Sequence, residues 1–261
     1  MTDIPTGPRS LPSQMGAHMR LVDGEPECWL EVTPERSHRG IALGACLVML
    51  ADVGAGYAAE LASEDDWSFT VDIGVRRSPG TSAEFRGRPV VQRAGRTVSI
   101  DLPLVDDTGG ATATAVSTFI RLPRRPQDPP RPDFPIDSMS WAAAPEAPLA
   151  ELLGAEETSR GLTVELGPQL LNPAGILQGG VSALLAELAA LRILEAEAGP
   201  LVTTGFDVRY VTMGRVGPFD AVVDPVGPHA AAVKVLDRGA DDAVVTHNLL
   251  SFTASPGSPG V

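Results

Sequence analysis

Two apolar segments of the chain each contain a single acidic residue. Asp52 is the only charge between Gly44 and Tyr57, and Glu187 is the only charge between Gly179 and Leu191. On a helix, the neighbours three and four positions away are apolar or glycine, so neither carboxylate has a polar face around it. An apolar wall raises the pKa of a carboxyl group and makes its carboxylate a better base. Both residues are therefore candidates for acid–base or nucleophilic chemistry, and exposure on a helix surface is the alternative.

A turn and a glycine pair precede the second of these segments. Asn172-Pro173 and Gly175 form the turn, and Gly179-Gly180 open the apolar run. A backbone N–H at a helix start polarises a nearby carbonyl group, and glycine allows a close approach. Gly179 is thus a candidate oxyanion donor. Turn geometry alone is the competing explanation for both Gly179 and Asn172.

The two acidic segments are copies of one pattern. Gly44 and Asp52 recur 135 positions later as Gly179 and Glu187. The same register pairs Asp72 with Asp207, and a later two-residue slip pairs Phe119 with Phe252. The sequence therefore indicates an internal duplication. A carboxylate that recurs at the same position of two apolar helices is much less probable by chance than a single one.

Composition limits the kind of partner. The chain has 261 residues, is 43% hydrophobic and carries a net charge of −13, which argues against nucleic acid or an anionic membrane. Residues 70–125 carry +4 and the remainder −17, so this segment either meets a phosphorylated ligand or is a solvated sheet face. Cys28 and Cys46 have no metal-binding spacing, the four histidines are scattered, and we expect no metal.

The sequence begins without an apolar signal segment, and we expect a cytoplasmic protein. The most apolar stretch, residues 41–59, contains Asp52 and three glycines. It is a poor candidate for a membrane span and is better explained as a buried helix.

The order of predicted elements is the same in both copies. We expect an irregular start (1–17), a first repeat (18–122), a proline-rich linker (123–140), a second repeat (141–253) and a disordered tail (254–261). The first repeat should contain a hairpin (19–32), a helix (44–62) and strands at 68–76, 83–92, 97–105 and 111–122. The second should contain a short helix (141–154), a strand (162–166), a helix (179–198) and strands at 201–211, 221–226, 230–237 and 243–252. Each half is an α+β unit with a sheet wrapped around one buried helix.

The order of an asparagine, six residues, Gly179-Gly180 and an acid seven positions later resembles the hotdog-fold acyl-CoA thioesterases of the phenylacetate-pathway type. The resemblance covers about residues 18–253. It implies a double hotdog, with two antiparallel sheets each wrapped around a central apolar helix and the two helices side by side. The outer face of the paired sheets would allow a homodimer of double hotdogs.

In that family the active site lies between two paired hotdogs, which implies two unequal sites here. One combines Asn172 and Gly179 with Asp52 and Thr70, and all four residues carry suitable chemistry. The other combines Ser37 and Gly44 with Glu187. It lacks the asparagine and has Gly205 at the hydroxyl position, with Thr203 and Thr204 nearby, and we take Thr204 as its candidate. We expect the second site to be degenerate. The family usually has histidine directly before the glycine pair. This chain has Gln178 at that position in the second copy and Leu43 in the first.

The resemblance also implies the reaction, hydrolysis of an acyl-CoA thioester to the free acid and CoA without a cofactor. Asp52 would attack the carbonyl or deprotonate water, Asn172 would orient the water or the thioester, and Thr70 would hydrogen-bond the water or the carboxylate. Thr70 as an ordinary β-branched strand residue is the alternative. The candidates for the CoA phosphates are arginines: Arg76, Arg77, Arg93, Arg96, Arg209 and Arg215.

Two other functions compete with thioester hydrolysis. A hotdog hydratase is disfavoured because no histidine lies in either helix or within six residues after Asp52 or Glu187. A non-catalytic acyl-CoA or acyl-carrier binding protein stays open, because duplication has removed site residues from one half. The sequence leaves the acyl group undetermined.

Overall fold

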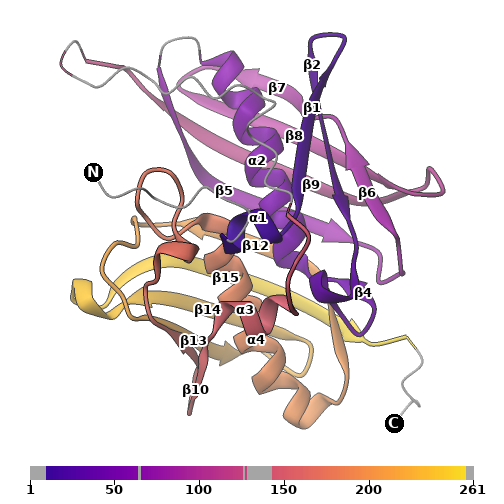
Figure 1. Cartoon of the computed structure of the whole chain (residues 1–261), viewed down its shortest axis with the longest axis vertical. Coiled ribbons are helices and arrows are strands. Elements are labelled where there is room, and N and C mark those ends of the chain that lie inside the picture. Colours follow the sequence, from indigo (N-terminus) through magenta and orange to yellow (C-terminus); the bar gives the residue numbers. More distant parts are fainter. Residues whose placement is uncertain (1–9, 64–65, 126, 128–142, 257–261) are drawn as a thin grey trace.

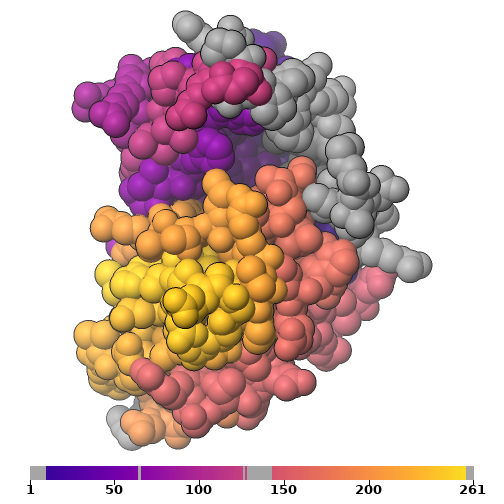
Figure 2. All heavy atoms as spheres, turned by 90° about the vertical axis from the view of Figure 1, so that its left-hand side faces the viewer, coloured from indigo at the N-terminus to yellow at the C-terminus, as the bar shows by residue number. Residues whose placement is uncertain are grey.

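The computed structural model describes residues 10–63, 66–125, 127 and 143–256. The first half of the chain forms one lobe and the second half the other, each with a long helix against a curved sheet (Figure 1). A space-filling view shows the same division, with the indigo-to-magenta half above the salmon-to-yellow half (Figure 2).

The first repeat contains one long helix and a series of strands. Its elements are α1 (Leu11–Gln14), β1 (Ala17–Val22), β2 (Glu25–Glu31), η1 (Pro34–Arg36), β3 (Ser37–His38), β4 (Ile41–Ala42), α2 (Gly44–Ala62), β5 (Trp67–Arg77), β6 (Glu84–Gly87), β7 (Val90–Ala94), β8 (Thr97–Asp106) and β9 (Ala111–Leu122). The predicted strand 83–92 is thus two strands, and Pro89, which lacks a backbone N–H, lies between them.

The second repeat follows the same order. Its elements are α3 (Leu149–Leu153), β10 (Glu156–Thr158), β11 (Gly161–Val164), η3 (Pro168–Leu170), α4 (Gly179–Ala198), β12 (Leu201–Tyr210), β13 (Phe219–Pro225), β14 (Ala230–Asp237), η4 (Arg238–Ala240) and β15 (Ala243–Ala254). Both long helices have the bounds that the sequence predicted. Most of the predicted linker and most of the tail lie outside the described residues.

The prediction of an irregular start over residues 1–17 was wrong for residues 11–14. Residues Leu11–Gln14 form α1, whose side chains are all buried. The Arg36 guanidinium holds this segment, donating to the carbonyls of Gln14, Glu31 and Ala143. These bonds between distant parts of the chain order a segment whose composition alone is typical of a loop.

The two antiparallel sheets that the sequence predicted, one around each long helix, are joined edge to edge. The strands form one 13-stranded sheet in the order β1-β2-β6-β8-β9-β5-β12-β15-β14-β13-β11-β10, with β7 paired to β8, and β3 and β4 form a small second sheet. The two halves join through antiparallel β5 and β12 at the centre. Counted outward from this junction, the strands of the two repeats follow matching orders, as duplication requires.

The register of this junction corrects the alignment of the two copies. Gly74 pairs with Asp207, and the pairs on either side are arranged symmetrically about them. Strand positions therefore match at 133 residues' distance, whereas the helix starts match at 135. The connection between helix and strand is shorter in the second repeat, so the slip precedes the strands. Asp72 matches Gly205, and Thr70 matches Thr203.

The two long helices lie in one apolar core. Helix α2 is long and apolar enough to span a membrane by length and composition, but 67% of that stretch is buried within the protein. It packs against α4, where a Cβ on Gly180 would lie 3.0 Å from the Met49 side chain. The core cluster takes residues from both repeats. Apolar packing on most sides explains why α2 has no polar face.

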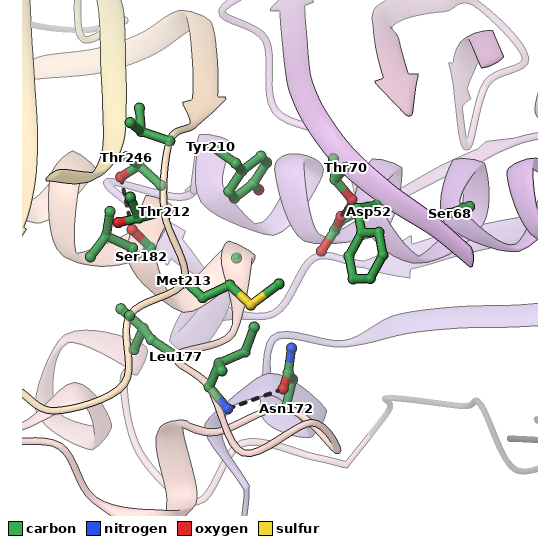
Figure 3. Close-up of a pocket in the computed structure, with 16 residues that line it drawn as sticks. Asp52, Ser68, Thr70, Asn172, Leu177, Ser182, Tyr210, Thr212, Met213 and Thr246 are labelled. Carbon is green, nitrogen blue, oxygen red and sulfur yellow. Dashed lines mark hydrogen bonds between the residues drawn. The ribbon is translucent and has the colours of Figure 1, made fainter. Parts of the chain in front are cut away.

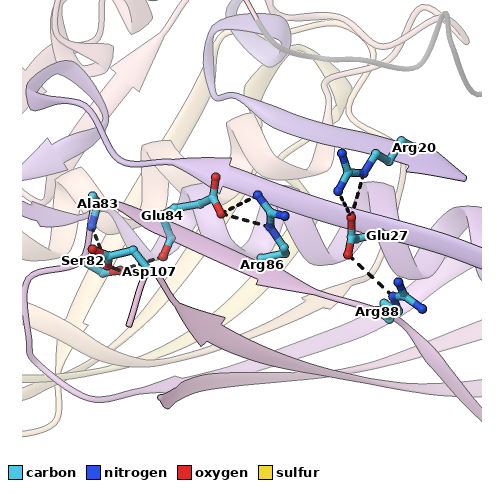
Figure 4. Close-up of polar contacts among 8 residues, drawn as sticks. All are labelled: Arg20, Glu27, Ser82, Ala83, Glu84, Arg86, Arg88 and Asp107. Carbon is cyan, nitrogen blue, oxygen red and sulfur yellow. Dashed lines mark hydrogen bonds and ion pairs between the residues drawn. The ribbon is translucent and has the colours of Figure 1, made fainter. Parts of the chain in front are cut away.

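Arginines at the outer edge of the first repeat pair with carboxylates. Glu27 accepts from Arg20 and contacts Arg88, while Glu84 binds Arg86 (Figure 4). Three arginines of residues 70–125 pair with carboxylates outside that segment: Arg88 with Glu27, Arg76 with Asp207 and Arg121 with Asp66. The positive surplus of the segment is therefore largely neutralised, as expected for a solvated sheet face.

Candidate active site

Asp52 is held at both carboxylate oxygens by residues from the two repeats. The Thr70 hydroxyl donates to Oδ1 (2.9 Å), and the Gln178 side-chain amide donates from Nε2 to Oδ2 (3.1 Å). The residue is half-buried. Burial raises the pKa of Asp52, against the two hydrogen bonds, which lower it. The arrangement leaves a positioned carboxylate with enhanced basicity.

Gln178 also caps helix α4. Its Oε1 accepts hydrogen bonds from the N–H groups of Gly180 and Val181. These are two of the N–H groups that a helix start leaves unpaired. The Gly179 N–H has no acceptor among the described residues. Sequence reasoning noted Gln178 only as a departure from the family; its place directly before Gly179-Gly180, where an N-cap oxygen is useful, was the available signal.

Asn172 shapes the loop in front of this helix. Its Oδ1 accepts the N–H groups of Ala174 (2.9 Å) and Ile176 (3.3 Å). Gly175 completes the turn at φ +73°, a conformation that favours glycine. The turn fixes the oxygen of the side-chain amide, and its nitrogen points toward the cavity (Figure 3). Turn chemistry and a place in the site are therefore compatible.

The four residues of the expected competent site line one cavity of about 360 Å³ (Figure 3). Phe69 and Met213 also line it and are 37% and 46% exposed, which gives the opening an apolar rim. Further along the wall, the Ser182 and Thr246 hydroxyls hydrogen-bond each other (2.9 Å). The remaining lining residues are Ser68, Ile176, Leu177, Tyr210, Val211, Thr212, Gly214 and Val245.

Glycine is required at position 179 by its neighbour. A Cβ there would lie 2.8 Å from both Cε1 and the hydroxyl oxygen of Tyr210. Any side chain would displace the Tyr210 ring and narrow the approach to the Gly179 N–H. The glycine thus serves close approach as well as the helix start.

The second candidate site, around Glu187 and Gly44, is closed to substrate. Glu187 is 1% exposed, and its carboxylate accepts the N–H groups of Gly44 and Ala45 (2.8 Å each) and the Thr203 hydroxyl. These N–H groups open α2, whose N-cap, Leu43, offers no side-chain oxygen. Glu187 is therefore the cap of α2. The N–H that a substrate carbonyl would need is already occupied.

One methylene separates the two arrangements. Glu187 reaches the start of the opposite helix, whereas the shorter Asp52 bonds to Thr70 and Gln178, and the Gly179 N–H stays free. The expected inequality of the sites thus has a geometric basis in the lengths of the two acidic side chains.

Two residues expected in the second site do not reach Glu187. The Ser37 hydroxyl donates to the Pro34 carbonyl (2.9 Å), and the Thr204 hydroxyl donates to the Ser251 carbonyl (3.3 Å). The choice of Thr204 was wrong because a β-bulge in β12 turns it outward and leaves Thr203 facing the helix. The bulge in β5 after Thr70 is its counterpart.

Comparison with solved structures identifies the architecture. A protein of unknown function from Alicyclobacillus acidocaldarius described as having the hot dog fold aligns at 14% identity over 94% of this chain and 98% of its own, with a TM-score of 0.54. The chain has the hotdog fold. An acyl-CoA thioesterase II from Mycobacterium marinum aligns at 13% identity over 96% and 100% (TM-score 0.58), and an acyl-ACP thioesterase from Bacteroides thetaiotaomicron at 15% over 87% and 97% (TM-score 0.57).

Sequence comparison identifies nothing: no protein-family model and no curated protein matches the chain. The structural neighbours of this hotdog protein are thioesterases that it covers almost completely. The predicted resemblance to hotdog-fold thioesterases is confirmed at the level of fold.

The arginines expected to meet CoA are scattered over the hotdog. Arg77 was a wrong choice, because it is buried and donates to the Thr203 and Ala42 carbonyls beside the second site. Arg76 is bound twice by Asp207, and Arg209 lines a different hollow. Arg93 and Arg96 are exposed away from the cavity lining. Arg215 is the candidate nearest the opening, with Nη2 3.0 Å from Sδ of the rim residue Met213.

A metal centre is not formed by the described residues, where no three His, Cys, Asp or Glu side chains gather.

Proposed function

We propose that the protein hydrolyses an acyl thioester at one composite site between its two hotdog repeats. The observation that carries the proposal is the Asp52 carboxylate, fixed by Thr70 and Gln178 in the same cavity as the free N–H of Gly179. A base and an oxyanion donor that line one cavity are what water attack on an activated carbonyl requires.

The proposed reaction needs no cofactor. Asp52 takes a proton from water as the water oxygen bonds to the thioester carbon, and the carbonyl oxygen gains charge beside the Gly179 N–H. The C–S bond then breaks, the carbonyl re-forms, and the proton passes to the departing thiolate. Asn172, whose amide nitrogen faces the cavity, would orient the water or the thioester.

We propose acyl-CoA as the substrate, with the pantetheine arm crossing the apolar rim of Phe69 and Met213 toward Arg215. The thioesterase neighbours named for acyl-CoA and for acyl-ACP support thioester hydrolysis and leave the carrier to experiment. The homodimer and the cytoplasmic location remain predictions.

The test is release of free thiol from short, medium, long and aryl acyl-CoAs and from the matching acyl-pantetheines. Wild type, Asp52→Asn and Glu187→Gln are compared. We expect wild type and Glu187→Gln to hydrolyse the substrate and Asp52→Asn to lose this activity. If the protein binds the nucleotide of CoA, KM should be higher for acyl-pantetheine than for the matching acyl-CoA. Binding of acyl-CoA without turnover on any substrate would favour the non-catalytic binding protein instead.

A further inference from the structure

The Tyr210 hydroxyl is a buried polar group without a partner. Tyr210 ends strand β12 and lines the cavity, and its hydroxyl oxygen is hidden from solvent with no hydrogen bond among the described residues. Buried tyrosine hydroxyls usually find a partner, because leaving one unpaired is costly. An orphaned donor at a candidate active site therefore calls for a ligand atom that completes it.

The position of this hydroxyl relative to Gly179 indicates which atom. It lies 2.8 Å from where a Gly179 Cβ would be, beside the free N–H at the start of α4. Figure 3 shows the hydroxyl on the side of the ring that faces Asp52. A carbonyl oxygen drawn to the Gly179 N–H from the cavity would come within reach of both donors.

The duplicated half provides an internal comparison. Tyr210 matches Arg77, because both these residues and their strand partners, Thr246 and Ala113, are 133 positions apart. Arg77 occupies the closed site, where its attraction to Glu187 opposes the lowering of its pKa by burial. A cation thus lies near the acidic side chain of the closed site. At the open site the same position carries a neutral donor, which suits an oxygen that becomes negative only during reaction.

We propose that the Tyr210 hydroxyl donates a second hydrogen bond, beside that of the Gly179 N–H, to the thioester carbonyl oxygen. This inference rests on the proposed function and adds a residue to it. The bond strengthens as the carbonyl oxygen gains charge, so it acts mainly on kcat. Tyr210 is then a catalytic residue that sequence reasoning missed.

The protonation state fits this role. Burial, and secondarily the charge of Asp52, raise the pKa of Tyr210 well above its ordinary value. Between the raised pKa of Asp52 and the higher pKa of Tyr210, Asp52 is ionised and the phenol keeps its proton. Donor and base are therefore both competent in that pH range.

The experiment compares Tyr210→Phe with Tyr57→Phe, since Tyr57 is the only other tyrosine and lies outside the cavity lining. We expect kcat for thiol release to fall about 10²-fold in Tyr210→Phe, the magnitude typical for loss of one oxyanion donor. KM, the melting temperature and the pH at which activity is half-maximal should stay unchanged. Tyr57→Phe should retain wild-type kcat.

A binding measurement tests the same contact without turnover. The probes are an alkyl-CoA thioether, which lacks the carbonyl, and a 2-oxoalkyl-CoA of equal length, which has one. Wild type should prefer the ketone, and Tyr210→Phe should lose about tenfold in ketone affinity while binding the thioether as wild type does. Intact thioether binding also shows that the variant is folded.

Two outcomes would overturn the inference. If Tyr210→Phe keeps kcat and ketone affinity within twofold of wild type, the hydroxyl does not touch the carbonyl oxygen. If the variant instead shifts the acidic limb of the pH profile, the hydroxyl bonds to Asp52 and not to substrate. Absence of turnover in wild type would defeat the proposed hydrolysis and leave the ketone comparison to judge Tyr210 separately.

Discussion

The Glu187 carboxylate accepts a hydrogen bond from the Gly44 N–H across the junction of the two repeats, at 2.8 Å. The equivalent Gly179 N–H donates no such bond to a described residue, because the equivalent acid, Asp52, is one methylene shorter and is held by Thr70 and Gln178. Glu187 thereby caps helix α2 and closes its site, whereas Asp52 leaves the Gly179 N–H available to substrate.

Lengthening the acid at the open site should close it. In Asp52→Glu we expect the carboxylate to reach the Gly179 N–H, as Glu187 reaches Gly44, and to block the oxyanion position. Activity should fall about 10²-fold or more although a carboxylate is retained, since loss of an oxyanion donor typically costs that much. Thiol release and the melting temperature are the measurements. An Asp52→Glu protein that keeps a tenth or more of wild-type kcat would contradict the length argument.

Removing the charge of each acid should have opposite effects on stability. Asp52 has a raised pKa in the folded protein, so folding favours its protonated form, and stability declines as pH rises from the ordinary carboxyl range through that raised pKa. Asp52 bears this cost in full only above the raised pKa. Asp52→Asn should therefore be inactive yet melt higher than wild type at pH 7, and the difference should shrink near pH 4.

Glu187→Gln should instead stay active and melt lower. The substitution replaces a buried carboxylate that accepts the Gly44 and Ala45 N–H groups and the Thr203 hydroxyl, and a buried donor left without its acceptor costs about 1–3 kcal/mol. Thermal unfolding and thiol release on the same preparation measure both properties. Equal loss of activity in Glu187→Gln and Asp52→Asn would mean that both sites work or that the core has collapsed.

The sequence predicted both long helices, because their apolar runs and glycine starts are local signals. That Asp52 and Gly179 share a site was predicted only from the family resemblance. It misassigned Thr204 because a β-bulge and the length of a connection decide which hydroxyl faces the helix. The continuous sheet was missed because β5 and β12 pair over a long sequence separation. The place of Gln178 before Gly179-Gly180 indicated at most a helix cap, because its bond to Asp52 crosses between repeats. Tyr210 carries no local signal, because its position beside Gly179 depends on tertiary packing.

The pH profile should report on Asp52 and on Gln178 together. Activity requires ionised Asp52, so kcat/KM should fall as pH drops through a pKa that burial holds above the ordinary value. Gln178→Leu copies Leu43 of the closed site and removes a hydrogen bond that lowers this pKa. The acidic limb should therefore move to higher pH in Gln178→Leu, with kcat reduced about tenfold. Leu43→Gln provides the matched change at the closed site and should leave the profile in place.

Adding one methyl group at the helix start tests the close approach. In Gly179→Ala the new Cβ would meet the Tyr210 ring and hydroxyl at 2.8 Å, so the ring must move into the cavity. We expect both kcat and the affinity for a 2-oxoalkyl-CoA to fall at least tenfold. Gly199→Ala, at the far end of α4, has open space for a Cβ but a φ of +74°, so it should cost stability without changing kcat.

Single turnover in ¹⁸O-water should separate the two possible roles of Asp52. If Asp52 deprotonates water, the label enters the released acid in the first turnover and none remains on the protein. If Asp52 attacks the carbonyl itself, the first product carries an unlabelled carboxylate oxygen, because hydrolysis of the resulting anhydride at the Asp52 carbonyl leaves ¹⁸O in the Asp52 side chain. Both Asp52 oxygens already accept hydrogen bonds, from Thr70 and from Gln178, which restrains the carboxylate from the rotation that attack requires. We therefore expect label in the acid, measured by mass spectrometry of product and of the peptide containing Asp52, and ¹⁸O in that peptide would establish the nucleophilic route.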